Sequence, residues 1–323
     1  MFLPEYSITP DILKNISLIE YSRAVIENTT ILPSWENQIS KETKVIFMQS
    51  NLKKLNVNTE LTQVKAWFDR VTDNEPMEFQ DLMSADKYLD KVYSGNDLTE
   101  ANIKEIAKIL NHRTGYRDLN INGGPKPEEI LAKTVQFFDW TQTLDGKETH
   151  PVILASISRM YFEYLKPFRK NNTVISSFIF IGFLKHRGYS FKNLFCLENY
   201  FDQTSSEYKS HISKTSGENI DYTAWIEYVT NGMAQELSNL KERIKILARD
   251  TKIAKATGRA KFTPRQERIV EYLQDYGILQ NKDFARIFPD TSEDSVLRDL
   301  KVLIQKGIIQ KSGSTKSSLY ELS

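Results

Sequence analysis

Three basic side chains stand close together in a polar loop between two predicted helices. Lys166, Arg169 and Lys170 follow a helix that begins at Pro151, and they precede an apolar helix that starts after residues 171–173. The first N–H groups of a helix have no partner inside it, and they attract negative charge. The loop therefore has the residue types that could hold a phosphate or another anion without a metal ion. The alternative is that the lysines are solvated residues on an inert scaffold.

Residues 263–323 have the pattern of a winged-helix domain. Helix starts are marked by Thr263, Asn281 and Ser292, and a strand pair follows them. In such domains the third helix enters the major groove of DNA, and phosphate contacts supply much of the affinity. The predicted nucleic-acid contacts are the basic residues of this helix and of the strand pair, namely Arg298, Lys301, Lys311 and Lys316.

The charge of this domain leaves its partner open. Glu293 and Asp294 occupy the first turn of the third helix, and basic and acidic residues balance over 263–323. A basic linker over 249–262 could add affinity for phosphates. We expect DNA binding, with a protein partner as the alternative.

The whole chain has the composition of a globular protein with two or three domains. Of its 323 residues, 40% are hydrophobic and 26% charged, and 43 Lys and Arg face 42 Asp and Glu. This balance excludes a uniformly basic nucleic-acid protein. The single cysteine, Cys196, excludes an intrachain disulfide, and four scattered histidines lack the spacing of metal ligands. The most apolar stretch, 174–184, is about half of the roughly 20 residues that a bilayer requires, so we expect a cytoplasmic chain without membrane contact.

The elements that must position the basic loop are helical. Helical periodicity dominates up to about residue 260 and predicts a mainly α protein. The exception is 115–124, where brief alternation and a Gly-Gly turn predict a small β-hairpin. The predicted domains are an N-terminal helical region over 1–97, a core over 98–248, the linker over 249–262, and the winged helix over 263–323.

The stretch Phe162 to Asn172 resembles the signature of the Fic (Fido) family, H-x-F-x-(D/E)-G-N-G-R-x-x-R, which lies between two helices. Upstream residues resemble the flap hairpin of that family, namely Gly115, Tyr116, Arg117 and Ile121. The resemblance implies a Fic-fold helical core with a small β-hairpin flap, a C-terminal winged helix, and a role in signalling or transcription regulation. It also favours a homodimer.

The catalytic positions of the signature are replaced. Fic proteins transfer AMP from ATP to a protein hydroxyl, with the histidine as general base, the acidic residue on Mg²⁺ and the arginines on phosphate. Here Lys166 stands at the histidine position and Lys170 at the acidic position, while Val174 and Ser177 replace the arginines. A protonated lysine cannot accept the hydroxyl proton, and its charge repels a metal ion.

We therefore expect no AMP transfer, no cofactor and no metal site. Residual AMP transfer with ATP and Mg²⁺ is the alternative. The motif residues that could still contact a phosphate or a nucleotide are Lys166, Phe168, Arg169, Lys170, Asn171, Asn172 and Thr173.

A second part of the family pattern is also changed. Many Fic proteins carry an inhibitory helix, (S/T)-x-x-x-E-(G/N), whose glutamate pairs with the second motif arginine. The matching stretch begins at Ser50, and Lys54 stands at the glutamate position. The inhibitory glutamate and the arginine with which it would pair are both absent, which fits a chain without transferase activity.

Overall fold

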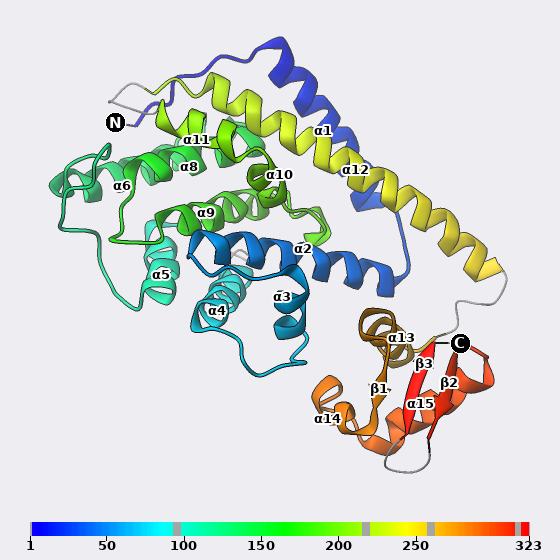
Figure 1. Ribbon diagram of the computed structural model, residues 1–323. Coiled ribbons are helices and arrows are strands. Elements are labelled where there is room, and N and C mark those ends of the chain that lie inside the picture. The colour runs from blue at the N-terminus through cyan, green and yellow to red at the C-terminus, as the bar shows by residue number, and fades with distance from the viewer. Residues whose placement is uncertain (1, 93–97, 215–219, 257–261, 314–317, 323) are drawn as a thin grey trace. The chain divides into compact units, whose positions relative to one another are not determined.

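Helices make up most of the chain, which confirms the predicted mainly α class (Figure 1). The computed structural model describes residues 2–92, 98–214, 220–256, 262–313 and 318–322. Its contacts divide the chain into two compact units. The core unit comprises Met1–Asn28, Thr43–Val64 and Asn74–Glu242, and the C-terminal unit comprises Thr29–Glu42, Lys65–Asp73 and Arg243–Ser323.

The first helices of the chain are α1 (Pro10–Asn28), α2 (Pro33–Lys54), α3 (Leu61–Phe68), α4 (Met77–Val92), α5 (Glu100–Asn111), α6 (Pro127–Gln142) and α7 (Leu144–Glu148). They are followed by α8 (Pro151–Leu165), α9 (Asn172–His186), the 3₁₀ turn η1 (Phe191–Asn193), α10 (Glu198–Gln203), α11 (Ser205–Ser213) and α12 (Thr223–Ala256). Helix α12 continues into the predicted basic linker, and residues 257–261 of that linker lie outside the described residues.

Helices α8 and α9 form the centre of the core unit, where they lie side by side (Figure 1). Pro151 occupies the first turn of α8, where a proline costs no hydrogen bond. Both helices are apolar on almost every face, so they must be buried on almost every face. The ring of Phe137 on α6 packs against those of Phe162 on α8 and Phe183 on α9, at centroid distances of 5.3 and 5.9 Å.

The C-terminal unit confirms the predicted three helices and strand pair, and it adds a strand that the sequence pattern does not show. Its elements are α13 (Pro264–Tyr276), β1 (Leu279–Gln280), η2 (Asn281–Asp283), α14 (Phe284–Ile287), α15 (Glu293–Gln305), β2 (Ile309–Ser312) and β3 (Leu319–Leu322). The sheet is antiparallel in the order β1-β3-β2, with Leu279 opposite Tyr320 and Ile309 opposite Leu322. Two residues are too few to show the alternation that identifies a strand, so β1 was missed.

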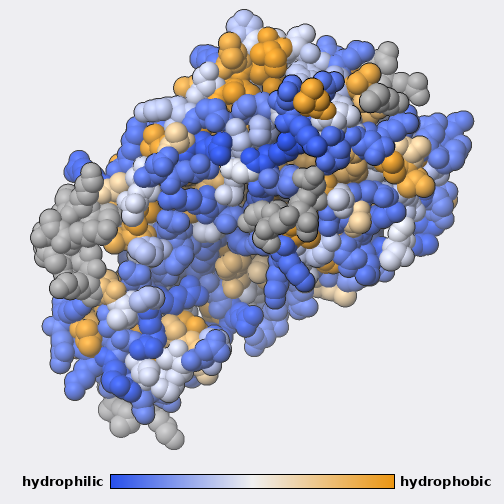
Figure 2. Space-filling view, turned by 180° about the vertical axis from the view of Figure 1, so that it is seen from behind, coloured by the Kyte–Doolittle hydropathy of each residue, from blue (hydrophilic) through white to orange (hydrophobic). Residues whose placement is uncertain are grey.

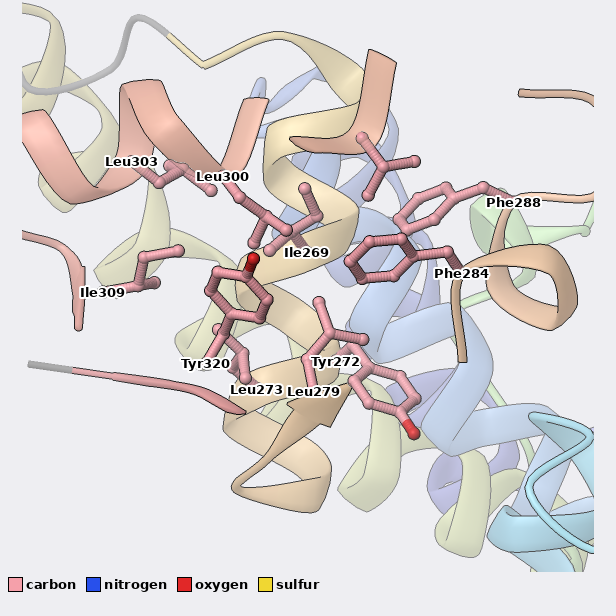
Figure 3. Close-up of a cluster of buried hydrophobic side chains, with 11 residues drawn as sticks. Ile269, Tyr272, Leu273, Leu279, Phe284, Phe288, Leu300, Leu303, Ile309 and Tyr320 are labelled. Carbon is pink, nitrogen blue, oxygen red and sulfur yellow. The ribbon is translucent and has the colours of Figure 1, made fainter. Parts of the chain in front are cut away.

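The sheet and the helices of this unit enclose a small hydrophobic core (Figure 3). Ile269 from α13, Leu300 from α15 and Tyr320 from β3 point toward one another in it, and Phe284 from α14 lies beside them. Each of the four side chains is at most 3% exposed. Burial of this set against one another orients the outer face of α15 toward solvent.

Two segments from the N-terminal part of the chain belong to the same unit. Lys41 of α2 contacts Asp69 at 2.6 Å and Asp275 of α13 at 2.8 Å. Lys65 of α3 contacts Asp275 at 2.6 Å, and Tyr276 donates a hydrogen bond to Asp69. We name these residues the ion cluster of the C-terminal unit: Lys41, Lys65, Asp69, Asp275 and Tyr276.

The predicted β-hairpin over 115–124 is wrong. This segment makes turns, and no strand occurs in it. The reason lies in Arg117, whose guanidinium donates to the carbonyl of Leu119 at 2.7 Å and to that of Lys166 at 2.8 Å. Carbonyls satisfied by a side chain do not need a strand partner.

The surface agrees with the charged composition. Figure 2 shows one face on which hydrophilic residues predominate and hydrophobic residues gather in small groups. Across the described residues, we find no helix with the length and apolar character needed to cross a bilayer.

Candidate functional site

The loop over residues 166–171 joins α8 to α9, and we call it the motif loop. Its own side chains hold it in place. Lys166 ends α8 in the left-handed conformation (φ 41°, ψ 61°), and Asn171 precedes α9 in the same region (φ 60°, ψ 21°). Asn172 accepts a bond from the N–H of Phe168 at 2.9 Å and donates to its carbonyl at 2.7 Å. Asn171 donates to the carbonyl of Leu110 at 3.0 Å. The two asparagines therefore brace the loop, and Phe168 is buried beneath it.

Arg117 ties the flap segment to this loop. Besides its side-chain bonds to Leu119 and Lys166, its backbone N–H donates to the carbonyl of Pro167 at 2.9 Å. Its side chain is buried, and burial lowers the pKa of its guanidinium. The flap residue predicted from the resemblance thus has a structural role in this chain.

A cavity of about 530 Å³ opens beside the loop, between α2, α8 and α11. Four basic residues contribute to its lining, namely Lys54, Arg159, Lys166 and Lys209. Two acidic residues, Glu163 and Asp202, line it as well. Cavities of this size accept small molecules. The remaining lining residues are Gly123, Tyr164, Thr173, Phe201, Ser205, Tyr208, Ile212 and Ser213.

A buried carboxylate organises two of the cations. Glu198 of α10 accepts two bonds from Arg159, at 2.6 and 3.2 Å, and it forms an ion pair with Lys54. The side chains of Arg159 and Glu198 are 0% and 2% exposed. Burial alone would raise the pKa of Glu198, but Arg159 and Lys54 outweigh it and lower that pKa to about 2. The carboxylate is therefore ionised at neutral pH, and the three groups together carry one excess positive charge.

Glu163, one of the two carboxylates on the cavity wall, is enclosed by hydroxyl groups. Glu163 accepts bonds from Tyr208 at 2.9 Å, from Ser176 at 2.9 Å and from Thr173 at 3.0 Å. Burial raises the pKa of Tyr208 well above its ordinary value, so its hydroxyl stays a donor. Arg159 also donates to Tyr208, at 3.1 Å. A carboxylate with three donors around it is satisfied without a metal ion.

Lys54 occupies the place that the resemblance assigns to the inhibitory glutamate. Its ammonium donates to the hydroxyl of Ser177, at the second arginine position, at 3.3 Å. The two residues that the resemblance places at these positions therefore face each other in this chain. Glu198 supplies the counter-charge for Lys54 in place of a motif residue.

The structure separates the predicted anion-binding residues into two groups. Lys166 and Thr173 line the cavity, as does Lys54. Arg169 instead pairs with Asp118 at the surface, and Lys170 is exposed. The three basic residues of the loop are therefore not one cluster, because the left-handed turn at Lys166 separates its side chain from the other two.

The remaining predicted residues are not among those that line this cavity. Of the predicted flap, Tyr116 packs its ring 5.6 Å from that of Phe168, and neither Gly115 nor Ile121 is among the lining residues. The predicted nucleic-acid contacts Arg298, Lys301 and Lys311 are exposed in the C-terminal unit, and Lys316 lies outside the described residues.

Sequence reasoning missed the charged lining residues Arg159, Glu163, Asp202 and Lys209, and the lining residue Tyr208. It also missed Glu198, which pairs with Lys54 and Arg159. A signal was present for two of them, because Arg159 and Glu163 are charged residues one turn apart in an otherwise apolar helix. Such residues are buried only with partners. No comparable signal marks Glu198, because the first turn of a helix, here α10, is an ordinary place for an acidic residue.

Neither a metal site nor a reactive thiol accompanies the cavity among the described residues. The described residues hold no group of three or more His, Cys, Asp and Glu that could bind a metal ion. Burial raises the pKa of Cys196 to about 12, so its thiol is not a nucleophile at neutral pH.

Solved structures share this arrangement of helices. A Fic family protein from Desulfovibrio desulfuricans G20 superposes with a TM-score of 0.64 and 15% identity, over 100% of this chain and 98% of that chain. The chain has the Fic fold. Fic-1 (aa134–508) from C. elegans shares the Fic fold with a TM-score of 0.55 and 10% identity, over 73% of this chain and 71% of that chain.

A Fic domain containing signaling protein from Bacteroides thetaiotaomicron VPI-5482 gives a TM-score of 0.50 and 16% identity, over 75% of this chain and 98% of that chain. By sequence, no family model and no curated protein matches. The Fic fold is thus carried here by a sequence that has diverged far from these structures.

Proposed function

We propose that this chain is a Fic-type regulatory protein that does not transfer AMP, and that its cavity binds a phosphate or a nucleotide without a metal ion. The observation that carries the proposal is the set of basic residues on the cavity wall, with Lys166 at the position of the family's general base. A fixed cation on the cavity wall favours binding of an anion. It does not favour removal of a proton from a hydroxyl group.

The residues at the positions that would serve AMP transfer also argue against that reaction. Lys170, at the position of the metal-binding carboxylate, is exposed and is not among the lining residues. Val174, at the first arginine position, is buried in α9. Phosphate contacts are therefore expected from the lining residues Lys54, Lys166 and Lys209, of which only Lys166 is among the motif residues expected to contact a phosphate.

Ligand-dependent melting tests this proposal. We expect AMP, ATP or inorganic phosphate to raise the melting temperature equally with and without Mg²⁺, by the equivalent of about 2.7 kcal/mol at a hundredfold excess over the dissociation constant. Lys166→Met should reduce the shift at least severalfold, since it removes a cation from the wall. The measurement is differential scanning fluorimetry on the purified full chain.

Lys126→Met is the matched control, because Lys126 is exposed at the start of α6 and is not a lining residue. It should leave the shift unchanged. A shift that requires Mg²⁺ would favour the alternative, a residual AMP transferase that uses ATP. Absence of any shift would leave the core unit as a scaffold.

For the C-terminal unit we propose a winged helix that binds DNA. The order α13-β1-α14-α15-β2-β3 with a three-stranded sheet is the order of such domains. Helix α15 keeps Asp299 inward, where it bonds with Gln266 at 2.8 Å and pairs with Arg265. The same helix exposes Arg298 and Lys301 one turn apart, which suits contact with phosphates.

DNA affinity should depend on salt. For duplex DNA we expect the logarithm of the binding constant to fall linearly with the logarithm of the salt concentration, and the double variant Arg298→Ala/Lys301→Ala to reduce that slope by about 2. Fluorescence anisotropy at several salt concentrations measures it. Lys14→Ala, an exposed lysine of α1, is the control and should keep the slope. Absent or salt-insensitive binding would argue for a protein partner instead.

A further inference from the structure

Helices α2 and α3 each belong to both units. The division places Thr29–Glu42 in the C-terminal unit and Thr43–Val64 in the core unit, yet α2 is one continuous helix. Helix α3 starts in the core unit and ends in the C-terminal unit. Helix α12 is divided as well, but it contributes no residue to the lining of the cavity. Of the shared helices, α2 alone supplies a cavity residue.

The ammonium of Lys54, at the end of α2 beside the cavity, has two possible partners: Glu198 and a bound anion. Lys54, the last residue of the helix, pairs with Glu198 and donates to Ser177, and it also lines the cavity. A bound anion would compete with Glu198 for this ammonium, which has three donors. Lys54 is 17% exposed and Glu198 is 2% exposed, so the competing charges are poorly screened by water. Anion binding and the Lys54–Glu198 pair are thus linked.

The segment that follows α2 is packed against it and does not form a loose connection. The N–H of Val57 donates to the carbonyl of Leu52 at 2.9 Å, and the side chain of Gln49 donates to the carbonyl of Thr59 at 2.9 Å. The start of α3 at Leu61 follows directly. A displacement of the end of α2 would therefore reach α3.

Both helices also carry residues of the ion cluster. Lys41 on α2 is shared between Asp69 and Asp275, and Lys65 on α3 also contacts Asp275. The side chains of Lys41 and Asp275 are each 13% exposed, and that of Asp69 is 3% exposed. Energies of such weakly solvated ion pairs change steeply with distance. Small movements of α2 or α3 would alter these contacts.

We propose that anion binding in the cavity is transmitted to the C-terminal unit through α2 and α3. Lys54 turns from Glu198 toward the anion, and the contacts of Lys41 and Lys65 with Asp69 and Asp275 respond. The inference rests on the proposed anion site, and it makes the binding of DNA or a protein partner dependent on that ligand.

Hydrogen exchange on the full chain tests the inference. Amide exchange is followed by mass spectrometry with and without AMP or inorganic phosphate, in the absence of Mg²⁺, at concentrations that shift the melting temperature. We expect exchange to change at least twofold both around Lys54 and in α13, which carries Asp275. Lys54→Met should keep a melting shift through Lys166 and Lys209 but lose the change in α13.

Lys87→Met is the matched control, because Lys87 is exposed on α4 of the core unit and is not a lining residue. It should keep both effects. A melting shift without any change of exchange in α13 would overturn the coupling and leave the anion site standing. So would a change in α13 that survives Lys54→Met. No melting shift with any of these ligands would overturn both the site and the coupling.

Discussion

Glu198→Gln is expected to lower the free energy of unfolding of the core unit by about 3–5 kcal/mol, because it leaves the guanidinium of Arg159 buried without a counter-charge. Arg159 is 0% exposed, and Glu198 supplies both of its carboxylate contacts. Lys54 loses its ion pair at the same time. Urea denaturation followed by tryptophan fluorescence measures the change, since Trp225 is 0% exposed in this unit.

Acid stability provides a second readout of the same variant. A carboxyl whose pKa is about 2 in the folded chain, against 4.5 in a model compound, stabilises the fold above pH 4.5 and loses that contribution as the pH falls toward 2. The wild type should lose roughly 3 kcal/mol from this group over that range, and Glu198→Gln should not. Glu207→Gln, at an exposed glutamate of α11, should stay within about 0.5 kcal/mol of wild type. An equally mild effect of Glu198→Gln would show that the buried charge on Arg159 does not depend on this carboxylate.

Asp69→Asn is expected to destabilise the C-terminal unit by about 2–4 kcal/mol, although residue 69 lies far from 263–323 in the sequence. Asp69 is 3% exposed, pairs with Lys41 at 2.6 Å and accepts a bond from Tyr276. The amide retains an acceptor for Tyr276 but leaves Lys41 with Asp275 as its remaining carboxylate in the ion cluster. Loss of amide protection in α13 and β3, relative to wild type, measures the effect.

The neighbouring Asp73 offers a control for this variant. It lies in the same segment and is exposed, so Asp73→Asn should change protection little. If Asp69→Asn behaved like Asp73→Asn, residues 65–73 would be dispensable for the C-terminal unit. That result would also weaken the inferred route through α3, because Asp69 belongs to the ion cluster in which Lys41 and Lys65 meet.

The motif loop illustrates what sequence patterns can and cannot predict about this site. The resemblance to the family signature implies which positions are replaced, and the helix expected after residues 171–173 begins at Asn172. Their grouping was not readable, since the prediction placed Lys166, Arg169 and Lys170 together. A single left-handed residue at Lys166 separates them, and no local pattern predicts such a conformation for a lysine.

The flap is a second case. Alternation and a Gly-Gly turn favoured a hairpin, but Arg117 satisfies carbonyls of its own segment and of the motif loop. A buried guanidinium needs several acceptors, and carbonyls of two neighbouring segments provide them. The competition between a strand partner and a distant side chain is decided by packing, which short-range patterns do not describe.

The sequence by itself determined the helical class and most of the elements of the C-terminal unit. These depend on periodicity, capping and residue identity, which act over a few neighbouring positions. Only the tertiary structure decided that Arg159, Lys54 and Glu198 meet, and that Lys41 and Asp69 join Asp275. The partners of a buried charge come from segments distant in sequence, so they are set by how helices pack and not by local propensity.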